Sequence, residues 1–112
     1  IHRITRDHSV VEDLIVQGEI TPEEARQHPQ RNLITRALGS ERQVQADLYE
    51  ERLAEGEVIL LCTDGLSNVV TEQEILYELV YGGPIETCCQ RLLDITISRG
   101  APDNVTVVLF QV

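Results

Sequence analysis

Two short apolar runs, separated by two helical patterns, most constrain what this chain can fold into. The first run covers residues 58–62 and is continuously apolar, and the second, over residues 105–112, is nearly so. A strand without polar alternation is expected to be covered on both faces. We therefore predict two buried strands, apolar enough to pair with each other, with the intervening helices as cover, which is an α+β arrangement.

The two helical patterns lie over residues 71–81 and 84–99. In the second, the apolar side chains recur at the spacing that places them on one helix face: Ile85, Cys88, Cys89, Leu92, Leu93, Thr96 and Ile97. In the first, the residues expected to point inward are Ile75, Leu76, Leu79 and Val80. Because Cys88 and Cys89 fall on the apolar stripe, we expect them to be packing residues and not reactive thiols.

Residues 9–31 are expected to form a short helical hairpin. A Ser or Thr followed three residues later by Glu marks helix starts at Ser9 and Thr21, and the same signature occurs at Thr71. Gly18 suits the end of the first helix, and Pro22 suits the first position of the second. Two further strands are predicted over residues 32–37 and 47–52.

The composition excludes several function classes. The formal net charge is −10, which repels nucleic acid and anionic membrane surfaces. No apolar run approaches the roughly 20 residues of a membrane span. The three cysteines lack the spacing of a zinc site or a disulfide framework, which fits a cytoplasmic protein. Since the chain has no Met and begins at Ile1, we expect a piece of a longer protein.

Two acidic residues stand at the ends of the apolar runs. Asp64 follows the first run and Asp103 precedes the second. If the strands pair in antiparallel order, both carboxylates emerge at the same edge of the sheet. Such a pair is costly without a cation, and Mg²⁺ or Mn²⁺ suits carboxylate and water oxygens. Asp-Gly and Pro-Asp are also common turn dipeptides, so two ordinary turns remain the alternative.

The neighbours of these acids are candidates for support. Gly65 would let the backbone turn tightly and approach an ion. Asn104 would either orient a carboxylate or form a turn with its own backbone.

Other polar residues give weaker signals. His28 is a candidate acid on the substrate side, with a role at a helix end as its alternative. Arg31 and Arg36 could meet a phosphate, or form surface ion pairs. His2 and His8 fit no ligand pattern.

Seven motifs follow one another along nearly the whole chain. They are TRDHS at 5–9, GEITPEEA at 18–25, HPQRN at 28–32, ITRALG at 34–39, Gly56, LLCTDGLSN at 60–68 and GAPDNVTVV at 100–108. In this order they resemble the metal-dependent protein phosphatases of the PPM class, the protein phosphatase 2C family, in its bacterial form.

The resemblance implies a hydrolase that uses two or more Mg²⁺ or Mn²⁺ ions to attack phosphoserine or phosphothreonine with a metal-activated water. Asp64 and Asp103 match metal aspartates of the family, and residues 9–31 match a variable flap on which some bacterial members carry a histidine where His28 stands. The implied partners are a phosphorylated protein substrate and a serine/threonine kinase system.

The resemblance also implies that residues 1–112 are the C-terminal part of one phosphatase domain, the C-terminal half of an α/β/β/α four-layer sandwich. Residues 57–112 would form the strand, helix, helix and strand that carry the metal ligands. The first metal aspartate and the phosphate-binding arginine of the family have no counterpart, so the chain alone is expected to be inactive and to self-associate through unpaired strand edges. The alternative is a non-catalytic regulatory or docking module with a phosphatase-like fold.

Overall fold

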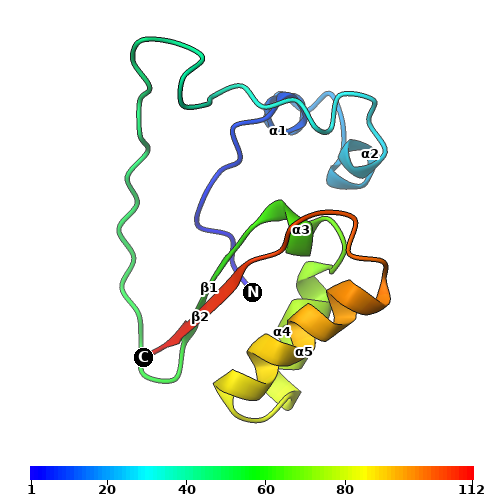
Figure 1. Cartoon of the computed structure of the whole chain (residues 1–112). Coiled ribbons are helices and arrows are strands. Elements are labelled where there is room, and N and C mark those ends of the chain that lie inside the picture. The colour runs from blue at the N-terminus through cyan, green and yellow to red at the C-terminus, as the bar shows by residue number, and fades with distance from the viewer. The chain divides into compact units, whose positions relative to one another are not determined.

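The computed structural model describes residues 1–112 as two compact units, coloured along the chain in Figure 1. One unit comprises residues 2–50, and the other comprises residues 51–112 together with Ile1. Helices and strands occur together, which confirms the mixed class. None of the helices has both the length and the apolar character needed to cross a membrane.

The unit of residues 51–112 is built on one antiparallel strand pair. Strand β1 (Val58–Cys62) pairs with β2 (Val107–Gln111) in a register that places Val58 opposite Gln111 and Cys62 opposite Val107. The first strand has the predicted bounds, whereas the second is shorter than predicted at both ends. Between them lie α3 (Asp64–Ser67), α4 (Glu72–Tyr81) and α5 (Ile85–Ser98), so the predicted order of strand, two long helices and strand is confirmed.

The helices cover only one face of the strand pair. Leu60 and Val107 pack against a core of four fully buried residues, which are Leu66, Val70, Ile75 and Leu92. Leu61 and Phe110, whose side chains alternate to the other face, are each 60% exposed. The expectation that the first run is covered on both faces is therefore wrong for this structure, because α3, α4 and α5 all contribute to a single layer.

The apolar stripe of α5 is confirmed except at its last position. Cys88, Leu92 and Thr96 are buried, and the Thr96 hydroxyl donates to the Leu92 carbonyl at 3.0 Å. Cys88 Sγ contacts the Glu78 carbonyl at 3.2 Å, as expected of a packing residue. Ile97 is exposed, although the adjacent Thr96 in the same last turn of the helix is buried.

Helix α4 turns part of the predicted face inward. Ile75 is buried and Leu79 packs against the core, as predicted, whereas Leu76 and Val80 are exposed and Glu78 is buried instead. The inward position of Glu78 has an electrostatic reason, since its carboxylate accepts from the Arg91 guanidinium of α5. Burying a charge is costly unless the charge is paired and hydrogen-bonded, and Arg91 provides that partner for Glu78.

A second arginine-carboxylate pair joins α4 to the end of α5. Arg99 donates two hydrogen bonds to Glu74, at 2.7 and 2.8 Å. The same carboxylate accepts the Thr71 amide at 2.9 Å and completes the predicted capping box at the start of α4. The Arg99 guanidinium first and the Thr71 amide second lower the pKa of Glu74 from 4.5 to about 2.

Helix α3 lies very close to the loop that precedes β2. A Cβ added at Gly65 would stand 2.0 Å from the Asn104 carbonyl oxygen and 2.9 Å from its carbonyl carbon. Only a residue without a side chain permits this approach. Gly65 therefore sets the separation between the start of α3 and residues 104–105.

The unit of residues 2–50 contains the predicted helical hairpin. Helices α1 (Val10–Val16) and α2 (Pro22–Arg26) begin after Ser9 and Thr21, whose hydroxyls accept from Glu12 and Glu24 amides. Gly18 has a φ of 77°, which fits the predicted end of the first helix. Ala25 is the only buried residue of the two helices.

The strands predicted over residues 32–37 and 47–52 are wrong. The first forms one isolated antiparallel bridge, between Ser9 and Ile34, and the second forms no bridge. A strand requires a neighbouring strand along its whole length. Here the Arg36 guanidinium donates hydrogen bonds to the Gln45 carbonyl and the Asp47 carboxylate instead. Side-chain contacts thus replace a backbone ladder between these segments.

We predict that replacing Gly65 with Ala lowers the free energy of unfolding by about 1–3 kcal/mol, the usual cost of overpacking. The added methyl group would overlap the Asn104 carbonyl, so either α3 or the loop must move. Urea titration followed by circular dichroism measures the change. Ser67→Ala, on the exposed side of the same helix, is the matched control and should stay within about 0.5 kcal/mol. Equal midpoints for both variants would contradict the close approach.

We also predict that Glu74 contributes to acid unfolding. Because its folded-state pKa of about 2 lies below the ordinary 4.5, its stabilising contribution is complete above pH 4.5 and is lost as the pH falls through 2. Urea midpoints measured between pH 6 and pH 2 should therefore fall more steeply for the native chain than for Glu74→Gln. Glu86→Gln, on α5, should keep the native slope; a Glu74→Gln slope equal to the native one would show that the carboxylate is not held by Arg99.

Candidate metal centre

The antiparallel strand pair brings Asp64 and Asp103 to the same end of the sheet. Asp64 is the first residue of α3 and follows the end of β1 after Thr63, while Asp103 lies in the loop that leads into β2. Cys62 and Val107 are the last pair in the register, so both acids extend from this end. The predicted antiparallel pairing, and with it the convergence of the two segments, is confirmed.

Thr63 fastens the two segments beyond the last strand pair. Its backbone amide donates to the Thr106 carbonyl at 3.1 Å, and its hydroxyl accepts the Thr106 amide at 3.0 Å. The hydroxyl also donates to the Asn104 carbonyl at 3.4 Å. Thr63 is the residue before α3. A Thr at this position often caps the helix, but the Thr63 side chain makes no capping hydrogen bond. It bonds across to the other segment instead.

Sequence reasoning did not single out Thr63. Its signal is ambiguous, because a Thr before a helix predicts a cap as readily as a cross-strand bond. A Thr at the end of an apolar strand, with another Thr opposite it in the register, is the pattern that could have found it.

Asp103 and Asn104 form a local turn. The Asn104 amide donates to Asp103 Oδ1 at 2.7 Å, so one carboxylate oxygen is engaged by the backbone. The side chain in this bond is that of Asp103, so the bond is not the turn that the Asn104 side chain was expected to form as an alternative. The bond fixes the orientation of the carboxylate of Asp103, and its other oxygen makes no such bond. The role of the Asn104 side chain stays a prediction.

The donor set suits part of a divalent-metal site. Asp64 and Asp103 are both exposed, and their carboxylates are the hard oxygen ligands that Mg²⁺ and Mn²⁺ prefer. Nowhere in the chain do three or more His, Cys, Asp or Glu side chains gather closely enough to hold a metal ion by themselves. Mg²⁺ binds in many proteins through one or two carboxylates and several waters, so two acids fit one side of such a site.

The weaker candidates have local partners within residues 2–50. His28 Nδ1 accepts the Gln30 amide at 3.1 Å, and its carbonyl accepts from Arg31 at 3.1 Å. These contacts belong to the turn after α2, and the role of His28 at a flap stays a prediction.

Arg36 forms a surface ion pair, one of the two uses that the sequence allowed. Its guanidinium donates to Asp47 at 2.9 Å, and His8 Nε2 contacts the same carboxylate at 2.7 Å. The Arg36 and His8 hydrogen bonds lower the pKa of Asp47 to about 2. A guanidinium engaged in this way stabilises the fold of residues 2–50.

Comparisons with known proteins point to one class of enzyme. No family model matches the chain. Protein phosphatase PhpP of Streptococcus pneumoniae is 37% identical over 108 residues, which are 96% of this chain and 44% of that protein. The crystal structure of serine/threonine phosphatase Stp1 from Staphylococcus aureus superposes with a TM-score of 0.93 at 41% identity, over 99% of this chain and 44% of Stp1.

A further structure bears on the metal. The catalytic domain of serine/threonine protein phosphatase PstP, in complex with two manganese ions, has a TM-score of 0.78 and 38% identity over 95% of this chain and 43% of that domain. The chain therefore spans less than half the length of the relatives that it matches. Over nearly all its residues, the chain corresponds to the C-terminal part of the PPM, or PP2C-type, serine/threonine phosphatases.

Proposed function

We propose that residues 51–112 supply one side of the metal site of a Mg²⁺- or Mn²⁺-dependent serine/threonine protein phosphatase, with Asp64 and Asp103 as the metal-binding carboxylates. The observation that carries the proposal is the strand register, which brings both acids to one end of the sheet. Like charges held at neighbouring positions are readily accommodated by a divalent cation. The two manganese ions in the related PstP structure support a divalent metal in this family.

In this proposal, bound metal ions would lower the pKa of a coordinated water and so generate the nucleophile. The residues of this chain hold the two acidic segments together and orient the Asp103 carboxylate. Thr63 fastens the segment that carries Asp64 to the segment that carries Asp103. Gly65 fixes the distance between them, and the Asn104 amide orients the Asp103 carboxylate.

The remaining parts of the site are proposed to lie outside these 112 residues, because the relatives are more than twice as long as the segment they share with this chain. The substrates we propose are phosphoserine and phosphothreonine proteins of the cytoplasm, made by a serine/threonine kinase. Residues 9–31 would form the flap beside the site, with His28 on it. With only two carboxylates, this chain alone is expected to bind metal weakly and to be inactive, and its self-association stays a prediction.

Metal binding by this chain can be tested directly. Mn²⁺ broadens the NMR signals of amides near the bound ion, so titration should affect residues 64–65 and 103–104 first. Asp64→Ala should remove this selective broadening. Asp94→Ala is the matched control, since Asp94 is an exposed carboxylate on α5 that contacts only Gln90. Broadening that begins elsewhere on the acidic surface, or that survives in Asp64→Ala, would contradict the assignment.

Activity can be tested in a chimera in which this chain replaces the matching 44% of Staphylococcus aureus Stp1. We expect Mn²⁺-dependent hydrolysis of a phosphoserine peptide. Asp64→Ala and Asp103→Ala should each lower kcat/KM by about 100-fold or more, which exceeds the usual cost of losing a group that only orients a metal ligand.

The same chimera distinguishes the alternative of a non-catalytic module. Asp94→Ala should keep full activity. A chimera that folds, by circular dichroism and a cooperative melt, but shows no metal-dependent activity would favour a regulatory or docking role for this segment.

A further inference from the structure

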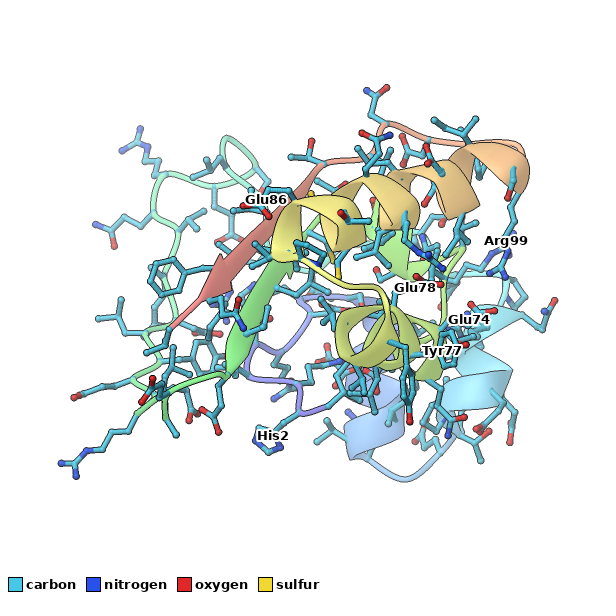
Figure 2. All side chains as sticks on the ribbon, turned by 90° about the horizontal axis from the view of Figure 1, so that it is seen from below. His2, Glu74, Tyr77, Glu78, Glu86 and Arg99 are labelled. Carbon is cyan, nitrogen blue, oxygen red and sulfur yellow. The ribbon has the colours of Figure 1, made fainter.

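Arg99 joins three segments of the unit of residues 51–112. Its backbone ends α5, and its guanidinium forms two hydrogen bonds to Glu74 in the first turn of α4. The same guanidinium donates to the Val69 carbonyl at 2.8 Å. Figure 2 shows Arg99 and Glu74 on the same side of the α4–α5 pair, with Glu86 at the opposite end of α5. One side chain thus connects α5 to α4 and to the residues that follow α3.

The Val69 carbonyl belongs to the segment that carries Asp64. The amides of Val69 and Val70 donate to Leu66, and the amide of Asn68 donates to Asp64, so residues 64–70 form one hydrogen-bonded unit. Val70 and Leu66 are also fully buried in the core. A group that binds the Val69 carbonyl therefore restrains the end of residues 64–70, the segment that begins with Asp64.

Arg99 also lies directly before the segment that carries Asp103. Asp103 follows Arg99 after a short turn in which Gly100 and Ala101 have positive φ values of 97° and 39°. The Ala101 amide returns to the Thr96 carbonyl at 3.0 Å, which fixes the direction of this turn. The position of Arg99 therefore determines where the loop to Asp103 starts.

We propose that Arg99 is a positioning residue for the metal site: by holding the Val69 carbonyl and Glu74 together, it fixes the segments of Asp64 and Asp103 relative to each other. The inference rests on the proposed function of the two acids. Arg99 would act through contacts to the backbone and to Glu74, and not as a ligand of the metal. Glu74 is the anchor, since its carboxylate is held by both Arg99 and the Thr71 amide.

The chain contains a matched pair for comparison. Arg91 also pairs with a glutamate of α4, Glu78, through two hydrogen bonds from α5. The Arg91 guanidinium donates its hydrogen bonds to Glu78 and none to residues 64–70. Loss of either pair weakens the contact between α4 and α5, but only loss of the Arg99 pair releases the Val69 carbonyl. A purely structural role would make the two arginines equivalent.

The test compares Arg99→Lys with Arg91→Lys in the 112-residue chain. Lysine keeps the charge but cannot reproduce the two parallel bonds of a guanidinium. The Mn²⁺ concentration at half-maximal broadening of residues 64–65 and 103–104 gives the apparent affinity, and thermal unfolding in EDTA gives the stability. We expect Arg99→Lys to weaken Mn²⁺ binding by roughly 3- to 10-fold, below the ~10- to 100-fold typical of direct partners of metal ligands. Arg91→Lys should leave the affinity within about 2-fold of the native value.

The outcomes separate the inference from the function on which it rests. If the native chain shows no broadening that depends on Asp64, the proposed metal site is wrong. If the native chain binds Mn²⁺ through Asp64 but the two lysine variants bind it equally well, Arg99 is a structural residue and the inference is overturned. Glu74→Gln removes the other partner of the same contact, so it should weaken binding as Arg99→Lys does.

Discussion

The register of a single antiparallel strand pair determines the geometry of the candidate metal centre. With Cys62 opposite Val107, the residues that follow one strand and precede the other meet at one end, and Thr63 bonds to Thr106 immediately beyond. A slip by one residue would exchange the two faces of one strand, because side chains alternate along it. Leu60 would then leave the core, and Thr63 would no longer lie opposite Thr106. The burial of one strand face and the position of the acids are therefore set by the same interaction.

The elements that the sequence predicted well are those marked by a continuous apolar run or a regular apolar repeat. The run at residues 58–62 became a strand with the predicted bounds, and the apolar residues of α5 that recur at the helical interval face the core. The predicted strands at 32–37 and 47–52 failed because polarity along a segment does not tell whether a neighbouring strand exists. The inward face of α4 was assigned correctly at Ile75 and Leu79 but not at Leu76 and Val80, and its second buried residue is Glu78, an acid whose partner Arg91 lies on another helix.

The candidate site divides in the same way. The placement of Asp64 and Asp103 at one end of the sheet could be predicted because each stands next to an apolar run, on the assumption that the two strands pair in antiparallel order. Thr63 and Arg99 could not, since they act through the carbonyl groups of Asn104 and Val69, and any residue supplies a carbonyl. Gly65 was predicted to let the backbone approach an ion closely, and the structure shows a close approach to the Asn104 carbonyl. A hydrogen bond to a backbone carbonyl does not depend on the side chain of the residue that accepts it, so the sequence gives no sign of such a contact.

The placement of the helices between the two strands makes the unit unequally sensitive to changes in chain length. Residues 82–84 connect α4 to α5 at the turn between these helices, and the cost of closing a flexible loop rises only slowly with its length. Extra residues there would lengthen a turn and leave the strand register intact. An extra residue between Cys62 and Gly65 would move Asp64 to a new direction and separate Gly65 from the Asn104 carbonyl. Natural or engineered insertions are thus accommodated at one end of this unit and excluded at the other.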